Sequence, residues 1–234
     1  MEYLSSNSPA RDAGKKIEVL LRTHRNVPIL LLLSGGSAFS VYEYINETAL
    51  GEHITVSVVD ERFSRDPEVN NFSQLEETAF FDVLMNSGVT FLSTKIQKGE
   101  TLPKAVMHFE KYICQWKKDN PQGIVITTLG VGSDGHTAGI LPFPENKRLF
   151  NDLFLDEEWV SGYDGTGKNK YPLRFTLTGT FLLDVVDYGV IFVTGEEKKG
   201  VLEELMHTEK EYHEMPAQLV KKMKASFLYT DMSV

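Results

Sequence analysis

The chain has 234 residues, 41% of them hydrophobic, and a formal net charge of −9. This is enough to bury one sizeable core, and the simplest organisation is a single domain over residues 1–234. An acidic chain without a stripe of Lys and Arg is not typical of a nucleic-acid-binding protein, so we expect no nucleic-acid partner.

The cysteine content and the apolar runs indicate the cellular compartment. Cys114 is the single cysteine, so no internal disulfide can form, and no N-terminal signal-peptide pattern is visible. The longest apolar run, residues 27–33, is far shorter than the roughly 20 residues that a membrane-spanning helix needs. We therefore expect a cytoplasmic protein without a membrane partner.

The first half of the chain alternates between helical and strand patterns. Apolar residues at helical spacing predict a first helix over 10–25. Short runs rich in apolar residues predict strands, and amphipathic runs follow them. The predicted elements are a strand at 29–33, a helix at 37–44, a strand at 54–59 and a helix at 71–85.

The second half continues this pattern and is interrupted once. The predicted elements are a strand at 89–92, a helix at 102–116, strands at 124–129 and 188–193, a helix at 196–206, a last helix at 216–224 and a last strand at 226–229. Between 146 and 180 the pattern weakens, with possible strands at 159–163 and 173–177 around a Gly- and Lys-rich loop. The alternation predicts an α/β fold with a mostly parallel, Rossmann-like sheet and helices on both faces.

One histidine follows a buried strand in a glycine-rich turn. The segment LGVGSDGHTAGILP, residues 129–142, places His136 just beyond the strand predicted at 124–129. Ligands bind beyond the carboxyl ends of the strands in such sheets, so His136 is a candidate general base or acid. The alternative is a turn histidine held by Asp134.

A second polar cluster follows the strand at 29–33. Ser34, Gly35, Gly36 and Ser37 offer glycines that let a ligand approach the backbone, with a helix N-terminus just beyond. This combination suits phosphate, although a tight strand-to-helix turn also needs glycine. The pattern is neither a P-loop nor a dinucleotide-binding motif, which argues against a nucleoside triphosphatase.

Charged groups follow two further strands. Asp60, Glu61 and Arg62 come directly after the strand at 54–59, where a carboxylate can orient an imidazole and a guanidinium can hold an oxyanion or phosphate. Lys198 and its neighbour Lys199 follow Gly195 in the same manner. The alternatives are a solvated ion-pair cluster and ordinary helix-surface lysines.

Two kinds of chemistry lack their sequence signature. No set of His, Cys, Asp and Glu has the spacing of metal ligands, so we expect no metal and no cofactor. No G-x-S-x-G elbow is present, and Ser34 has no base at a recognisable spacing. We therefore expect a reaction without a covalent serine intermediate.

Taken in order, these motifs resemble the 6-phosphogluconolactonase family over nearly the whole chain. They are SGGS at 34–37, DER at 60–62, LGVGSDGHTAGILP at 129–142, RFTLT at 174–178 and GEEK at 195–198. The broader superfamily also contains glucosamine-6-phosphate deaminases, which have a glutamate five residues beyond the histidine. Leu141 stands at that place here, which favours the lactonase branch.

This chain departs from the family's pattern at a few loop positions. Phe39 replaces a proline after the glycine turn, Ser64 a valine after DER, Asn70 a serine and Gly139 the serine of G-H-T-A-S. These departures bear on loop shape more than on chemistry.

The resemblance implies hydrolysis of 6-phospho-D-glucono-1,5-lactone to 6-phospho-D-gluconate in the oxidative pentose phosphate pathway. His136 would activate water, Asp60 or Asp134 would orient its ring, and Arg62 would bind the oxyanion or the phosphate. The phosphate site would comprise Ser34, Gly35, Gly36, Ser37, Arg174 and Lys198. The expected partner is a small phosphorylated sugar lactone, and the expected assembly is a monomer or a small homo-oligomer. A non-catalytic sugar-phosphate-binding protein and an amino-sugar-phosphate deaminase are the alternatives.

Overall fold

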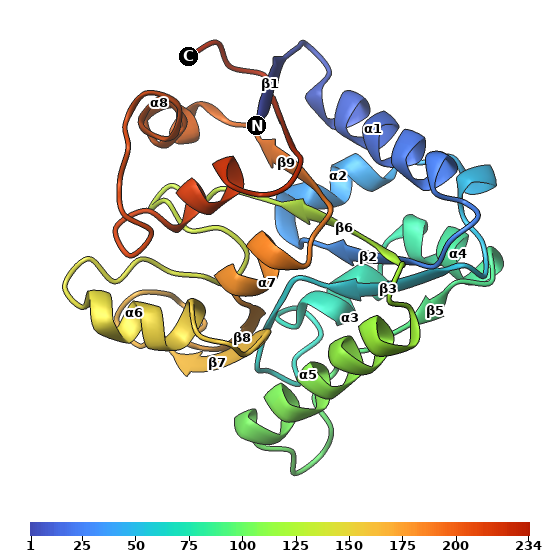
Figure 1. Ribbon diagram of the computed structural model, residues 1–234, viewed down its shortest axis with the longest axis horizontal. Helices are drawn as coiled ribbons and strands as arrows, with labels where there is room; N and C mark the ends of the chain where they lie inside the picture. Colours follow the sequence, from blue (N-terminus) through green and yellow to red (C-terminus); the bar gives the residue numbers. More distant parts are fainter.

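A computed structural model describes residues 1–234, and a parallel sheet runs through its centre (Figure 1). The sheet has seven strands in the order β1-β10-β9-β6-β2-β3-β5, and every neighbouring pair is parallel. The strands are β1 (Glu2–Ser5), β2 (Ile29–Leu33), β3 (Ile54–Val58), β5 (Thr90–Phe91), β6 (Ile124–Leu129), β9 (Tyr188–Val193) and β10 (Ser226–Thr230).

Strand β2 shows why the sheet is covered on both sides. All five of its residues are buried, and their side chains alternate between two hydrophobic clusters. Leu30 and Leu32 belong to one cluster, whereas Leu31 belongs to the other. The fold prediction of an α/β protein with helices on both faces of a mostly parallel sheet is confirmed.

The helices divide between the two faces according to the cluster in which their buried side chains lie. The face that carries Leu31 packs against α1 (Pro9–Thr23), α2 (Phe39–Tyr42), α3 (Asn71–Glu76) and α4 (Ala79–Asn86). The face that carries Leu30 packs against α5 (Leu102–Asp119), α6 (Lys147–Phe154), α7 (Gly179–Asp184) and α8 (Lys199–His207).

A second, antiparallel sheet of three strands lies on the α5 side in the order β4-β8-β7. Its strands are β4 (Asp60–Arg62), β8 (Leu173–Leu177) and β7 (Val160–Asp164). Asp60 pairs with Thr176 and Arg62 with Arg174. Directly opposite residues share a face, and so do residues two apart on a strand, so these four side chains project to one side of the small sheet.

Two sequence predictions about helices are wrong. The helix predicted over 71–85 ends at Glu76 and restarts at Ala79, because Thr78 is extended and its hydroxyl caps the backbone N–H of Phe81. The segment 216–224 forms a short 3₁₀ helix, Pro216–Lys221, in place of an α-helix. The remaining 3₁₀ helices are Gly36–Ala38, Glu47–Ala49 and Glu196–Lys198.

Four strands and α-helices have no counterpart in the sequence predictions: β1, α6, α7 and β4, whose three charged residues give no strand pattern. Strand β1 is short and only half-buried, so its pattern carries little signal. Helices α6 and α7 each begin at a side-chain cap, with Asn146 accepting from the N–H of Leu149 and Thr178 from that of Phe181. Both helices are short, which limits their periodic signal.

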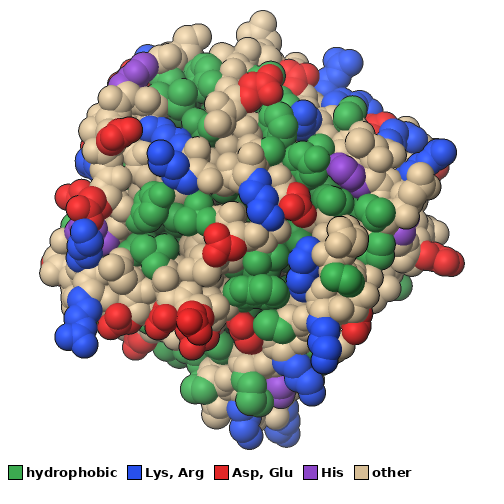
Figure 2. Space-filling model, viewed as in Figure 1, with side chains coloured by type: hydrophobic (Ala, Val, Ile, Leu, Met, Phe, Trp, Pro, Cys, Tyr) green, Lys and Arg blue, Asp and Glu red, His purple; other side chains and the backbone are tan.

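The surface of the protein is chemically mixed. Side chains of both charges are interspersed over the face shown in Figure 2, with apolar patches between them. None of the helices combines the length and the apolar composition that crossing a bilayer requires.

Candidate active site

The carboxyl ends of β2, β6 and β9 meet the small antiparallel sheet around a cavity of about 340 Å³. Fifteen residues line it, and only two of them are hydrophobic. They are Ser34, Gly35, Gly36, Ser37, Asp60, Arg62, Asn71, Gly130, Val131, Gly132, Ser133, His136, Ala138, Arg174 and Lys198. Every residue to which the family resemblance gives a catalytic or phosphate-binding role lines this cavity except Asp134, which contacts His136. The neighbouring Glu61 and Lys199 of the charged clusters do not line it.

The loop after β6 is folded so that His136 faces the cavity. The N–H of Gly132 donates to the carbonyl of His136, and the N–H of Gly135 donates to the carbonyl of Gly132. Gly135 has a φ of +83°, a backbone conformation that favours glycine. Farther along, the N–H of Gly139 donates to Thr176 Oγ1 at 3.0 Å, which fastens the loop to β8.

Asp134 is the carboxylate that contacts His136. Its Oδ1 lies 2.5 Å from Nδ1 of the imidazole and also accepts the backbone N–H of His136 at 3.1 Å. Burial tends to raise the pKa of Asp134, but the hydrogen bond and the charge of His136 outweigh it and lower that pKa. The pair leaves Nε2 as the ring nitrogen available to a ligand.

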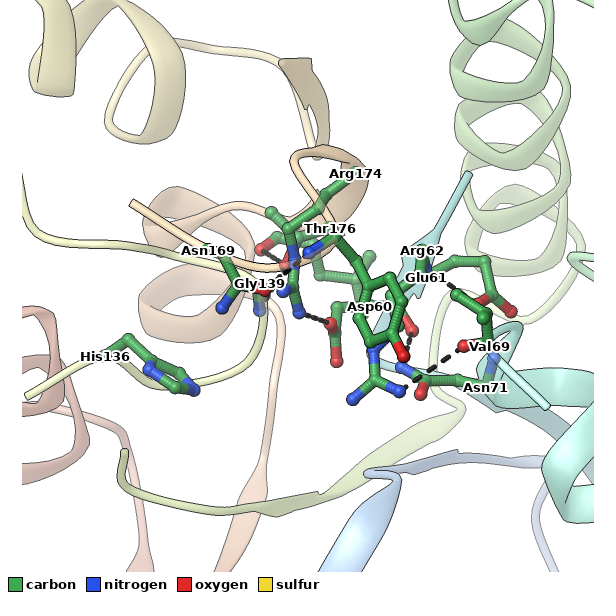
Figure 3. Close-up of polar contacts among 12 residues, drawn as sticks. Asp60, Glu61, Arg62, Val69, Asn71, His136, Gly139, Asn169, Arg174 and Thr176 are labelled. Atoms are coloured by element: carbon green, nitrogen blue, oxygen red, sulfur yellow. Dashed lines mark hydrogen bonds and ion pairs between the residues drawn. The ribbon is translucent and has the colours of Figure 1, made fainter. Parts of the chain in front are cut away.

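Asp60 has a different partner. Its Oδ2 lies 2.7 Å from Nη2 of Arg174, and both side chains are buried in the cavity wall. Burial alone would lower the pKa of Arg174, but the neighbouring Asp60 carboxylate raises it above its usual value. The geometry thus separates the two carboxylates, with Asp134 beside the imidazole and Asp60 beside a guanidinium. Figure 3 shows His136 apart from the Asp60–Arg174 pair.

Two other cations reach the cavity without a carboxylate partner. Arg62 donates from Nη1 to the carbonyl oxygen of Val69 at 3.3 Å, and neither it nor Lys198 forms an ion pair. Nζ of Lys199, the next residue, lies 3.9 Å from Oε1 of Glu196, and both side chains are exposed. Arg62 and Lys198 therefore supply the uncompensated positive charge of the site.

The turn after β2 presents mainly backbone atoms to the cavity. Ser34 is buried, and its hydroxyl donates to the carbonyl of Thr128 at 2.6 Å, so that side chain is engaged in joining β2 to β6. Gly36 has a φ of +66°, and the space around it is open. A Cβ on Gly35 would lie 2.8 Å from Oδ1 of Asn71. The backbone conformation at Gly36 thus favours glycine, and a side chain at Gly35 would displace that of Asn71.

The sequence predictions give no individual role to three residues of the site region. Asn71 lines the cavity and donates from Nδ2 to the carbonyl of Asp60 at 2.9 Å. Gly132 supports the imidazole, because a Cβ there would lie 2.1 Å from Nδ1 of His136. The G-x-D-G-H spacing carries the signal for Gly132, whereas Asn71 begins α3, and its contact with Asp60, 11 residues earlier, leaves no local pattern in the sequence.

The third is Glu61, which is fully buried behind the cavity on the opposite face of β4 from Asp60. Its carboxylate accepts the backbone N–H groups of Arg62, Asn71 and Phe72 and the hydroxyl of Thr94, at 2.5–2.9 Å. Burial raises the pKa of Glu61 to about 7, against the opposing effect of these hydrogen bonds. Glu61 therefore joins β4 to the start of α3.

Comparison with known proteins shows the family of the chain. Residues 6–229 match the family model described as glucosamine-6-phosphate isomerases/6-phosphogluconolactonase. The chain belongs to this family. The resemblance expected from the motifs is thereby confirmed.

Relatives within the family include two proteins from strains of Xylella fastidiosa, both named 6-phosphogluconolactonase. They are 30% and 29% identical to the chain over 210 residues, which cover 87% of the chain and 83% of each relative. The 6-phosphogluconolactonase structure from Thermotoga maritima has a TM-score of 0.71 at 22% identity, covering 97% of both chains. That from Plasmodium vivax has a TM-score of 0.76 at 15% identity, covering 99% of this chain and 91% of its own. These two structures share the fold.

Proposed function

We propose that the protein hydrolyses 6-phospho-D-glucono-1,5-lactone to 6-phospho-D-gluconate. The Asp134–His136 pair, which faces a cavity that also holds Arg62 and Lys198, carries this proposal. The imidazole is suited to activating water, and the cations are suited to a substrate with a phosphate group and a carbonyl that becomes an oxyanion. The named relatives in the family support the same reaction.

In this mechanism His136 is the general base. Nδ1 carries a proton that it donates to Asp134, so Nε2 is free to take a proton from water. The water oxygen then forms a bond to the lactone carbonyl carbon and produces a tetrahedral oxyanion. When the carbonyl re-forms, the bond to the ring oxygen breaks, and that oxygen takes the proton from Nε2. Asp134 stabilises the imidazolium between the two steps.

The remaining groups of the site would bind the phosphate and the oxyanion of the substrate. Lys198 follows β9, the glycine turn follows β2, and both strands flank β6, whose loop carries His136. We assign the phosphate to Lys198 and the backbone N–H groups of Gly35, Gly36 and Ser37. Arg62, on the small sheet, would stabilise the oxyanion. The paired Arg174 and Asp60 would form the cavity wall between the phosphate site and the oxyanion site.

The deaminase alternative lacks its extra carboxylate. Leu141 occupies the position at which the deaminase pattern has a glutamate, and it is fully buried in the core on the α5 side of the sheet. An apolar side chain there offers no acid or base to an amino sugar. A cytoplasmic location, a single domain and a monomer or small homo-oligomer stay part of the proposal.

The test is hydrolysis of freshly generated 6-phospho-D-glucono-1,5-lactone, measured above its spontaneous background. Wild type should be fast, and a folded His136→Ala variant should lose about a hundredfold or more of the rate. The exposed His207 provides a matched control, and His207→Ala should keep wild-type activity. Background rates in all three proteins, with 6-phosphogluconate still bound, would instead identify a non-catalytic sugar-phosphate-binding protein. Ammonia release from glucosamine-6-phosphate would identify a deaminase.

A further inference from the structure

The guanidinium of Arg62 has few contacts that fix its direction. Asp60, two residues before it on β4, is paired with Arg174. The side chain of Arg62 forms one hydrogen bond, the 3.3 Å contact from Nη1 to the carbonyl oxygen of Val69, and its Nε is buried without a partner. A guanidinium has five N–H donors, so a single long hydrogen bond leaves its orientation poorly determined.

An aromatic ring supplies the missing support. The guanidinium carbon of Arg62 lies over the ring of Tyr171, 5.4 Å from the ring centroid, which is within the range of a cation–π contact. Nζ of Lys170 lies 5.0 Å from the same centroid. Tyr171 does not line the cavity itself, so it reaches the site through Arg62.

Tyr171 sits on a loop that is fastened at several points. The loop joins β7 to β8, and its two ends are bridged by the Gly165 N–H donating to the Pro172 carbonyl at 2.9 Å. The N–H of Tyr171 donates to Oδ1 of Asn169 at 3.1 Å. The ring is half-buried, and its backbone is held in place.

The same loop is attached to the segment that follows the histidine loop. Nζ of Lys168 donates to Oε1 of Glu145 at 2.7 Å and lies 4.4 Å from the centre of the Phe143 ring. Phe143 comes directly after the LGVGSDGHTAGILP segment. The loop therefore contacts Arg62 with Tyr171 and the continuation of the histidine loop with Lys168.

We propose that Tyr171 is a positioning residue that holds the Arg62 guanidinium toward the substrate. The role requires the aromatic face and not the hydroxyl, because the face carries the attraction for the cation. Lys170 adds a second positive charge at the same ring, which favours the approach of an anionic substrate. This inference rests on the proposed lactonase function and deepens it.

The test compares Tyr171→Leu with Tyr171→Phe in the lactonase assay. We expect Tyr171→Leu to lower kcat/KM by about tenfold, the order of magnitude of a partly buried cation–π contact. Tyr171→Phe should stay near wild type. Tyr171→Leu should change the same kinetic constant, kcat or KM, that Arg62→Leu changes. In a protein that already carries Arg62→Leu, adding Tyr171→Leu should cause little further loss of kcat/KM.

Several outcomes would overturn the inference. These are equal losses in the Leu and Phe variants, an unchanged Leu variant, or a full further loss in the Arg62→Leu background. Tyr112→Leu, at an exposed tyrosine on α5, is the matched control and should behave as wild type. If Tyr171→Leu does not fold, Tyr171→Met provides an apolar replacement without a ring. An inactive wild type would contradict the lactonase function itself, whereas an active wild type with an unchanged Leu variant would contradict only the role of Tyr171.

Discussion

Asp60 and Arg174 form a buried ion pair across β4 and β8, although they stand 114 residues apart in the sequence. Arg174 lies directly opposite Arg62 in the antiparallel register, and like charges in that position repel each other. The carboxylate of Asp60 compensates the charge of Arg174. Arg62 is thereby left as the uncompensated cation of this wall.

Removing one partner of this pair should destabilise the protein strongly. Asp60→Asn leaves the buried guanidinium without a counter-charge, and we expect the free energy of unfolding to fall by about 3–5 kcal/mol. Urea denaturation measures this change. The double variant Asp60→Leu/Arg174→Met, which removes both charges, should recover much of the loss. An unfolding midpoint of Asp60→Asn equal to that of wild type would contradict the importance of the pair.

Gly132→Ala should inactivate the enzyme while leaving it folded. The new Cβ would lie 2.1 Å from Nδ1 of His136 and 2.6 Å from Oδ1 of Asp134, so the imidazole and the carboxylate must move apart. We expect a loss of about a hundredfold in kcat, comparable to the loss of a general base. Gly200→Ala, on α8, is the matched control because Gly200 does not line the cavity and no atom lies within 4 Å of its Cβ position. Comparable losses in both variants would be evidence against this steric explanation.

Asp134→Asn should lower kcat with a small change in KM. The amide cannot stabilise an imidazolium as the carboxylate does, and it can favour the wrong tautomer of the ring. Because the Asp134 side chain is 43% exposed, we expect a loss on the order of ten- to a hundredfold, smaller than at a buried triad aspartate. Steady-state kinetics on the lactone measures both constants. An unchanged kcat would exclude Asp134 as the partner of the base.

Lys198→Ala should raise KM for the phosphorylated lactone. Lys198 lines the cavity without an ion-pair partner, so its charge is available for the phosphate. A charge-assisted hydrogen bond to phosphate contributes about 1.5–3 kcal/mol, which corresponds to roughly a tenfold to hundredfold rise in KM. Lys199→Ala is the control, since Lys199 faces Glu196 on the surface. The assignment of Lys198 fails if the two variants have the same KM.

The buried Glu61 makes stability depend on pH. Its pKa is about 7 in the folded protein, against an ordinary value of 4.5. Between these values the folded state keeps a proton that the unfolded chain has released, so the free energy of unfolding falls as pH rises. The slope from this one group is at most about 1.4 kcal/mol per pH unit.

Comparison with Glu61→Gln isolates this effect, because glutamine does not titrate. The stability of wild type relative to the variant, measured by urea denaturation, should decline from about pH 5 to about pH 7. A constant or rising difference over this window would mean that Glu61 is ionised throughout.

The local parts of the site follow from the sequence, and the pairings across the fold do not. The contact between Asp134 and His136 is made within one short loop, so the D-G-H spacing already indicates it. The partner of Asp60 depends on an antiparallel sheet built from 60–62 and 173–177, and the former segment reads as a charged strand end. Tertiary pairing of this kind leaves no local periodicity to detect.

The bounds of the elements show the same limit, because buried strands are predictable from apolar runs and helix caps are not. The strand at 29–33 is a fully buried apolar run and that at 124–129 is buried except at Ile124, and the structure has both with the predicted bounds. The interruption of the helix at 77–78 depends on one hydroxyl cap, a signal that periodic spacing does not contain.

The pairing of β1 with β10 constrains the order in which the protein can be assembled. Residues 2–5 join the sheet only by lying beside residues 226–230, which come from the opposite end of the sequence. A segment that leaves the ribosome early must therefore wait until β10 has been synthesised and placed beside β9. Contacts of such long range slow folding, so we expect the β1 edge to be the last part of the sheet to become ordered.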